Sequence, residues 1–205
     1  TFEGGKGRLG FLQVRPMATA DSGAEIADAD LSCPLAVGAS ERALGHGTAP
    51  ELRDVVFLRP DFDMRDSPAA AQDLVAINRA LLLEGRPYLL IGFGRWGSSD
   101  PWLGVPVVWG QVAGARALVE VSPESRSIEL SQGSHFFHNL VGLGVPYLQV
   151  AQGGRVDWAF LLGLPRHRET PRVIHAACAD GLRVRVDGRL GRGLVLRPAS
   201  EPEHA

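Results

Sequence analysis

The stretch that decides the fold contains two apolar runs on either side of a helix-forming segment. The first run is Asp54-Val55-Val56-Phe57-Leu58-Arg59-Pro60, and the second is Tyr88-Leu89-Leu90-Ile91-Gly92. Short apolar runs rich in β-branched residues and bounded by Pro or Gly are typical of strands. Residues 67–84, which lie between them, are expected to form a helix. Two strands joined through a helix normally lie parallel in one sheet, so this stretch predicts a strand, helix, strand unit.

The helix prediction for residues 67–84 depends on its ends and on its apolar face. Ser67 is a suitable N-cap, Pro68 suits the first turn, and Gly85 follows the last helical residue. The apolar side chains recur at helical spacing, which indicates that one face packs on a sheet. They are Leu74, Ile77 and Leu81.

The rest of the chain favours strands over helices. We expect a helical turn near Trp109 and a short helix over 131–143. Hairpin chemistry at Asp187-Gly188 favours an antiparallel pair near the C-terminal end. The other apolar runs predict strands at 115–121, 147–151, 158–162, 182–186 and 194–196. The predicted fold class is α/β or α+β, a mixed β-sheet with few helices.

The first thirty residues differ in composition from the rest. Residues 9–16 predict a short strand closed by Pro16, whereas residues 17–31 are small, acidic and aperiodic, as linkers are. We therefore predict a terminal strand of another domain over 1–16, a linker over 17–31 and a separate α/β domain over 32–205. Its tail, 198–205, is expected to be disordered.

Composition narrows the classes of partner. The chain has 205 residues, 45% of them hydrophobic and 21% charged, with a formal net charge of −2, which is ordinary for a globular protein. Because its cations are scattered and no apolar run is long enough to span a bilayer, we expect no nucleic-acid or membrane partner and a cytoplasmic location. Cys33 and Cys178 lack partners at metal-ligand spacing and are predicted to be buried, reduced thiols.

The loop over 94–104 is the first candidate site, because it follows the end of a predicted central strand. Glycines and a proline impose special backbone geometry, and hydrogen-bond donors cluster between two tryptophans. Arginine, serine hydroxyls and backbone amides suit a phosphate or nucleotide. A rigid structural loop with an Arg95–Asp100 pair explains the same residues equally well. The residues concerned are Arg95, Trp96, Ser98, Ser99, Asp100 and Trp102.

The second candidate is the segment Ser131-Gln132-Gly133-Ser134-His135-Phe136-Phe137-His138-Asn139. In a helix, His135 and His138 share a face, and the exposed amides near Ser134 suit an anion. A metal site would need a third ligand, and a metal hydrolase that also uses Asp100 is a distant alternative. Capping together with packing by the two phenylalanines is the structural alternative.

A short motif near the start of the chain, Phe11-Leu12-Gln13-Val14-Arg15-Pro16-Met17, resembles the end of the ATP-grasp domain of phosphoenolpyruvate synthase and pyruvate phosphate dikinase. Gln13 and Arg15 point from one face of the predicted strand. The segments over 88–104 and 130–137 resemble a C-terminal extension carried by large bacterial proteins of that type. The resemblance implies that Gln13 and Arg15 touch nucleotide phosphates or their metal shell, with ATP and Mg²⁺ as cofactors and an upstream ATP-grasp domain as partner.

The resemblance also implies what this chain does not carry. The glycine-rich loop, the lysine and the magnesium ligands of the family would lie upstream of Thr1, and no phosphohistidine domain is recognisable. We therefore expect the C-terminal portion of an ATP-dependent phosphotransferase that is not catalytically complete. It would contribute a site for a small anionic ligand, with Gln13, Arg15, Arg95, Ser98, Ser99 and Ser134 as candidate binding residues. The alternative is a non-catalytic binding or scaffolding module.

Overall fold

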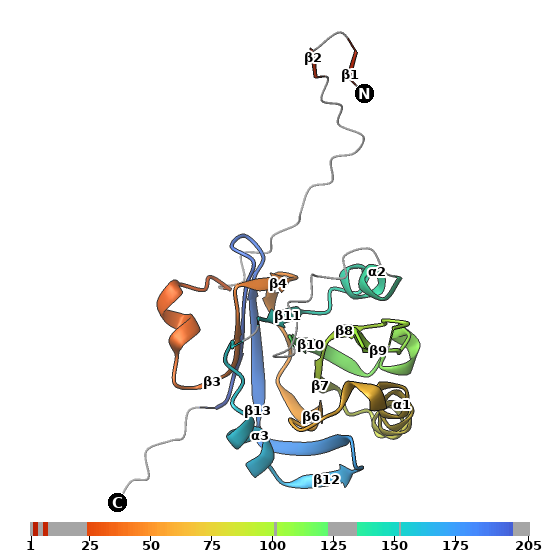
Figure 1. Ribbon diagram of the computed structural model, residues 1–205. Coiled ribbons are helices and arrows are strands. Elements are labelled where there is room, and N and C mark those ends of the chain that lie inside the picture. Colours follow the sequence, from red (N-terminus) through yellow and green to blue (C-terminus); the bar gives the residue numbers. More distant parts are fainter. Residues whose placement is uncertain are drawn as a thin grey trace, which may run out of the picture.

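The fold is described from a computed structural model, shown in Figure 1. The structure describes residues 24–100, 102–122, 135–151 and 153–198, with only the backbone described for His135. It also describes the backbone of two short strands, β1 (Phe2–Glu3) and β2 (Lys6–Gly7), which pair antiparallel. No helix within this part of the chain is long and apolar enough to cross a membrane.

Four parallel strands form the central part of the main sheet. Their spatial order is β6 (Leu52–Leu58), β7 (Tyr88–Phe93), β10 (Ala115–Val121) and β11 (Tyr147–Val150), which is also their order in the chain. Helix α1 (Ser67–Leu83) connects the first two, and helix α2 (His135–Gly142) lies between the last two. The predicted strand, helix, strand unit is therefore confirmed, including the parallel pairing of its strands.

The remaining strands complete the sheet with antiparallel pairs. The long strand β13 (Val173–Asp187) pairs with β6 along its first part and with β14 (Arg192–Leu196) along its last part. The ends of the sheet are β3 (Ala36–Ser40) beside β14 and β4 (Arg42–Leu44) beside β11. Because only Glu41 separates β3 from β4, the two ends of the sheet meet, and the sheet curls into a nearly closed cylinder.

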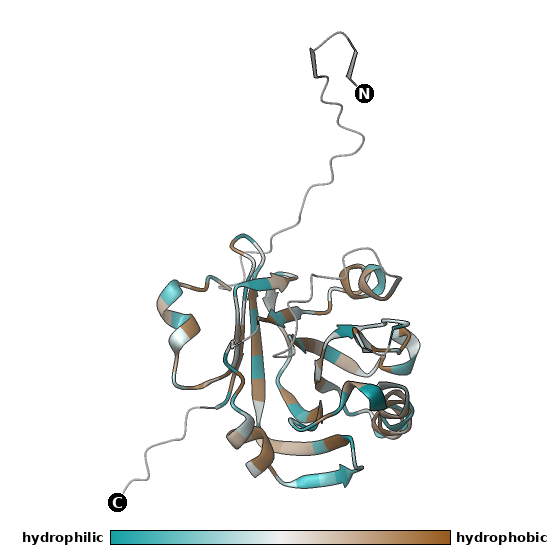
Figure 2. Ribbon diagram, viewed as in Figure 1, coloured by the Kyte–Doolittle hydropathy of each residue, from teal (hydrophilic) through white to brown (hydrophobic). Residues whose placement is uncertain are grey.

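Several shorter strands and helical turns accompany this sheet. Strand β12 is hydrophilic and pairs with the start of β13 (Figures 1 and 2). The other short elements are η1 (Asp28–Ser32), β5 (Gly47–Thr48), η2 (Met64–Asp66), β8 (Arg95–Trp96), β9 (Gly104–Val105), η3 (Trp109–Gln111), α3 (Trp158–Gly163) and β12 (Arg166–Glu169).

Two hydrophobic cores lie on the two faces of the parallel strands, because alternate side chains of a strand point to opposite faces. Leu89 and Ile91 belong to the core inside the curled sheet, where they meet side chains of β13 and β14. Tyr88 and Leu90 belong to the outer core, which α1, α2 and the segment over 94–112 cover. In Figure 1 these covering elements lie on one side of the sheet, opposite β3 and η1.

The predicted fold class, a mixed sheet with few helices, is confirmed, since the described residues form three α-helices against one large sheet. The strands predicted at 115–121, 147–151 and 194–196 and the helical turn near Trp109 are also present. The predicted N-cap of α1 differs by one position, because Ser67 is its first helical residue and follows directly on η2.

The strand predicted at 158–162 is wrong, because this segment forms helix α3. The Asp157 carboxylate accepts a hydrogen bond from the Phe160 backbone N–H at 3.0 Å, which caps the first turn. Short apolar runs do not distinguish a strand from a buried helical turn. The predicted hairpin is present, but its turn spans residues 188–191 rather than Asp187-Gly188, and its first strand begins much earlier, at Val173.

Residues 24–31, which the sequence assigned to a linker, pack against the domain. Ile26 is buried against Ala36 and Leu194, and its backbone N–H donates to the Asp187 carboxylate at 3.3 Å. One buried aliphatic side chain in an otherwise acidic segment was too weak a signal to oppose the linker composition. The strand predicted at 9–16 lies outside the described residues, as do residues 199–205 of the predicted tail.

Candidate functional site

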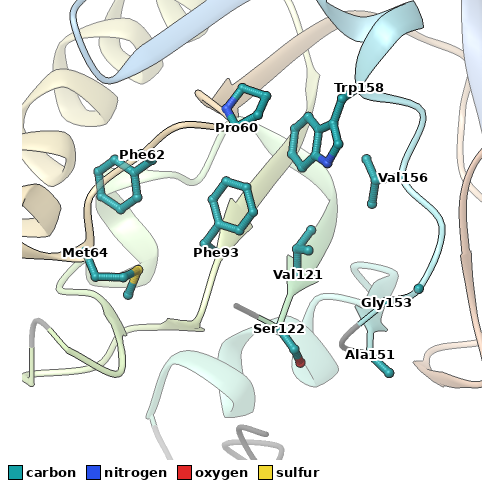
Figure 3. A pocket seen from close by; sticks show the side chains of 11 residues that line it. Pro60, Phe62, Met64, Phe93, Val121, Ser122, Ala151, Gly153, Val156 and Trp158 are labelled. Carbon is teal, nitrogen blue, oxygen red and sulfur yellow. The ribbon is translucent and has the colours of Figure 1, made fainter. Parts of the chain in front are cut away.

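The carboxyl ends of the four parallel strands meet at one edge of the sheet, where a pocket opens. In open α/β sheets, ligands bind at this edge. The pocket has a volume of about 530 Å³. We call it the strand-end pocket; its lining comes from the segments that follow β6, β7, β10 and β11, and comprises Pro60, Phe62, Met64, Phe93, Val121, Ser122, Ala151, Gly153, Gly154, Val156 and Trp158 (Figure 3).

Aromatic side chains form one wall of the strand-end pocket. The rings of Phe93 and Trp158 stack with centroids 5.3 Å apart and an interplanar angle of 24°. Trp158 also lies 6.4 Å from the ring of Phe57, which anchors it to the inner core. Figure 3 shows Phe62 and Met64 across the pocket from this stack. Since helix α3 carries Trp158, the Asp157 cap that starts this helix also sets the position of the wall.

The loop over 94–104 lies beside this edge and is built by close backbone contacts. Gly94 has a positive φ of 67°, and a Cβ at Gly104 would lie 1.9 Å from the Arg95 carbonyl oxygen, so only glycine fits there. These contacts allow β8 and β9 to pair in parallel. The loop is therefore a compact unit, as its glycines predicted.

The polar residues predicted in this loop have different environments. The Ser98 hydroxyl donates to the Asp100 carbonyl at 3.0 Å and accepts from the Asp100 N–H at 3.2 Å, so it serves the turn itself. Ser99 is exposed, and Arg95 is half-buried. The two tryptophans also differ: Trp96 is fully buried, whereas Trp102 is 56% exposed. The anion-binding role of Arg95, Ser98 and Ser99 stays a prediction.

Beneath the loop lies a buried polar group that the sequence did not reveal. Glu120 of β10 is fully buried between its register partners, Gly92 of β7 and Gln149 of β11. Its carboxylate accepts from the Gln149 side-chain amide at 3.5 Å and from the Trp96 backbone N–H. Burial raises the pKa of Glu120 to about 7, against the lowering effects of Tyr147, the Trp96 N–H and the charge of Arg95. We call Glu120, Trp96, Tyr147, Gln149 and Arg95 the Glu120 cluster.

The sequence did not reveal Glu120 because it stands in the middle of an apolar strand. A single charged residue in the run Ala117-Leu118-Val119-Glu120-Val121 normally faces solvent. The one available signal was the continuous apolar run before and after Glu120, because a strand without alternating polar residues is buried on both faces of its sheet.

Helix α2 packs against the loop over 94–104 through Phe136. A Cβ at Gly97 would lie 2.9 Å from the Phe136 Cβ, and the rings of Trp109 and Phe136 meet edge to face at 6.0 Å. Phe136 and Phe137 are buried, and His138 is exposed. These positions support the packing role of the two phenylalanines.

Some predicted site residues lie outside the described residues. These are Gln13, Arg15 and Ser134, and for His135 only the backbone is described. Within the described part of the chain, no group of three His, Cys, Asp or Glu side chains is placed to hold a metal ion. Cys178 is buried and Cys33 is half-buried, and both are free thiols.

A second buried carboxylate lies on the same face of the sheet, near the opposite edge. Asp54 of β6 accepts two hydrogen bonds from the Arg86 guanidinium, at 3.0 and 2.7 Å, and pairs with His175 Nε2 at 2.6 Å. His175 Nδ1 lies 3.2 Å from Arg168, which also pairs with Glu84. Burial alone would raise the pKa of Asp54, but His175 and Arg86 outweigh it and lower this pKa below its ordinary value.

The tautomer of His175 follows from these partners. Arginine only donates, so Nδ1 accepts from Arg168 and the Nε2–H donates to Asp54. His175 is fully buried, and each of its ring nitrogens has a partner. This network therefore has a structural role, which is to hold β6, β13 and the segment after α1 together.

Comparison of the chain with protein-family models, with curated proteins and with solved structures gives no match.

Proposed function

We propose that this domain is a small-molecule-binding module whose strand-end pocket holds a flat, largely apolar ring. The observation that carries the proposal is the stacked pair Phe93 and Trp158 at the carboxyl ends of the parallel strands. Stacked aromatic side chains with an open neighbouring space suit a planar ligand, since ring systems attract through offset or edge contacts.

Size and chemistry support this proposal. A volume of about 530 Å³ falls in the range of roughly 300–1,000 Å³ that is typical of small-molecule sites. Most of the lining side chains are apolar, and the Ser122 hydroxyl together with backbone groups, such as those around Gly153, supplies polar atoms to the pocket surface. Such a lining favours burial of a ring, with a small number of hydrogen bonds to orient it.

The resemblance to ATP-grasp enzymes narrows the proposal to a nucleobase. In a longer, cytoplasmic, ATP-dependent phosphotransferase, the strand-end pocket of this module would hold the base of a nucleotide. The phosphates and Mg²⁺ of that nucleotide would lie outside the pocket. Gln13, Arg15 and Ser134 are the proposed phosphate ligands, with Arg95, Ser98 and Ser99 on the neighbouring loop. The compact shape of that loop supports a fixed position for Arg95, Ser98 and Ser99.

Calorimetry with adenosine, ATP and inorganic phosphate tests the proposal. Trp158→Ala removes one ring of the wall, and Trp102→Ala is a matched control because Trp102 is exposed outside the pocket. Stacking on an aromatic side chain contributes about 1–3 kcal/mol per base, so Trp158→Ala is expected to weaken adenosine binding roughly tenfold to a hundredfold. Trp102→Ala should leave it unchanged.

The three ligands separate the parts of the proposal. Similar affinities for adenosine and ATP would support a base pocket without phosphate contacts in this chain. A much tighter complex with ATP, lost in Arg95→Ala, would support the anion role of the loop. Neutral aromatic fragments, tested by ligand-observed NMR, are the last probe. The binding-module proposal is wrong if none of the three ligands binds and if no fragment gives a signal that is lost in Trp158→Ala.

A further inference from the structure

Buried polar atoms without partners gather in the Glu120 cluster. The second carboxylate oxygen of Glu120 and the indole nitrogen of Trp96 lack a hydrogen-bond partner among the described residues, and the Tyr147 hydroxyl interacts with the Glu120 carboxylate without reaching the geometry of a full hydrogen bond. All three side chains are fully buried. A buried polar atom without a full hydrogen bond destabilises the fold, so several such atoms in one place indicate a common partner.

The register of the strands brings these three groups together. Glu120 lies opposite Gly92 on one neighbouring strand and is close enough to Tyr147 on the other for that hydroxyl to lower its pKa. The Trp96 ring covers Gly92, where an added Cβ would lie 2.4 Å from its Cζ2 atom. The indole nitrogen is two bonds from that atom, and neighbouring strands lie about 4.8 Å apart. The three polar atoms therefore surround one small region.

The charges of the cluster indicate a neutral occupant. Glu120 supplies one negative charge when it is ionised, and the charge of Arg95 lies near enough to lower its pKa. A cation would be repelled by Arg95, and an anion by Glu120. The remaining requirement is a molecule that accepts a hydrogen bond from the indole N–H and donates one to the carboxylate oxygen.

We propose that Glu120, Trp96 and Tyr147 form an internal binding site for a water molecule beneath the loop over 94–104, and that this water links the loop to strands β10 and β11. The Tyr147 hydroxyl directs its own proton toward the Glu120 carboxylate, so water accepts from the Trp96 indole N–H and donates to the carboxylate oxygen and to the tyrosine oxygen. Buried waters of this kind make about three hydrogen bonds to otherwise unsatisfied groups.

The loop over 94–104 covers this site through the side chain of Trp96. Its backbone N–H donates to the Glu120 carboxylate, and its indole covers Gly92. The pairing of β8 with β9 holds this residue in place, with the Arg95 N–H donating to the Leu103 carbonyl at 2.7 Å. The water would therefore be enclosed, and it would exchange with solvent only when the loop opens.

Water–protein NMR on the ¹⁵N-labelled chain tests the proposal. The Trp96 indole N–H is expected to show a cross-relaxation peak with water of the sign given by a long-lived bound molecule. The indole of the exposed Trp102 is the internal control and should show only the sign of fast surface hydration. A crystal structure that shows ordered water provides the second measurement, with density expected within hydrogen-bond distance of Glu120 Oε2 and Trp96 Nε1.

Variants of the chain separate a bound water from an alternative partner. Trp96→Phe removes one donor, and Glu120→Gln keeps the size of the side chain, so each should lower the occupancy of the density. The proposal is overturned if these two atoms bond to protein groups of residues 123–134 with no water between them. It is also overturned if the Trp96 indole behaves as the Trp102 indole does.

Discussion

Two buried carboxylates on one face of the sheet differ in the number of their partners. Asp54 has a bidentate arginine and a histidine, and its pKa is lowered. Glu120 has a weak amide contact and one backbone N–H, one of its oxygens lacks a partner among the described residues, and its pKa is raised to about 7. Both side chains are closed off from solvent, but their pKa shifts are opposite, because Asp54 has partners that stabilise its charged form whereas Glu120 is more deeply enclosed and has fewer of them.

The two carboxylates lie near opposite ends of the parallel strands. Asp54 lies near the start of β6, where Arg86 and Glu84 at the end of α1 complete a network of ion pairs. Glu120 lies near the carboxyl ends, beside the loop over 94–104. Perturbed and incompletely paired groups concentrate where a protein binds ligands. The charges near Asp54 are therefore well paired, whereas the polar groups near Glu120, beside the proposed binding pocket, are incompletely paired.

The largest effect is expected for Asp54→Asn. Removing the charge leaves Arg86 and His175 without their common acceptor, and breaking a buried ion pair costs about 3–5 kcal/mol. Urea unfolding measures the loss in the free energy of unfolding. The control is Asp61→Asn, because Asp61 is 78% exposed and pairs with Arg59 at 3.4 Å, so this change should cost less than about 1 kcal/mol. Equal losses in both variants would contradict the role of the network.

Glu120→Gln should act on the pH dependence of stability. The folded pKa of about 7 lies above the ordinary 4.5, so the folded state binds more protons between these values and the free energy of unfolding falls as the pH rises through them. The loss is about 3 kcal/mol by pH 8. Glutamine cannot ionise, so the variant should lack this fall and be more stable than wild type at pH 8.

Unfolding curves of both proteins at pH 5 and pH 8 isolate Glu120, because every other titrating group is common to them. Asp54 does not contribute in this range, since its lowered pKa places its loss of stability at more acidic pH. Parallel pH profiles for wild type and Glu120→Gln would show that Glu120 is not a perturbed acid.

Gly92→Ala should disturb the cover of the Glu120 cluster. The new Cβ would lie 2.4 Å from the Trp96 ring, so the indole must shift, at an expected cost of about 1–3 kcal/mol. The emission of Trp96 should move to longer wavelength as its surroundings become wetter. Gly110→Ala, with no atom within 4 Å of its added Cβ, is the matched control and should have little effect.

The smallest effect is expected for His167→Ala. The ring of His167 stacks on the buried His175 with centroids 5.5 Å apart, but His167 itself is exposed. Removing it should cost about 0.5 kcal/mol, since an exposed ring contributes only part of an aromatic contact. A loss above about 2 kcal/mol, measured by the same urea titration, would mean that the network at the Asp54 edge extends to the surface.

Much of the fold was predictable because its signals are local. The apolar runs, the Pro68 start and the Gly85 end of α1 lie within a few residues of the elements that they define. The segment over 158–162 was predicted wrongly because its short apolar run alone does not distinguish a strand from a helix, and the Asp157 cap that starts α3 lies outside that run. The glycines, proline, polar residues and tryptophans of the loop over 94–104 predicted an unusual segment, but they did not indicate that Ser98 would be used within the turn.

The sequence by itself predicted the first two parallel strands, the helix between them and the special backbone geometry of the loop over 94–104, since periodicity and backbone restrictions act over short distances. Only the tertiary structure decided that β3 and β4 close the curled sheet, that Phe93 meets Trp158 and that Glu120 is buried beneath Trp96. The physical reason is that the pKa of an acid and the shape of a pocket depend on groups brought together from distant parts of the chain. Gly92, Glu120 and Gln149 become neighbours only when three strands pair in register.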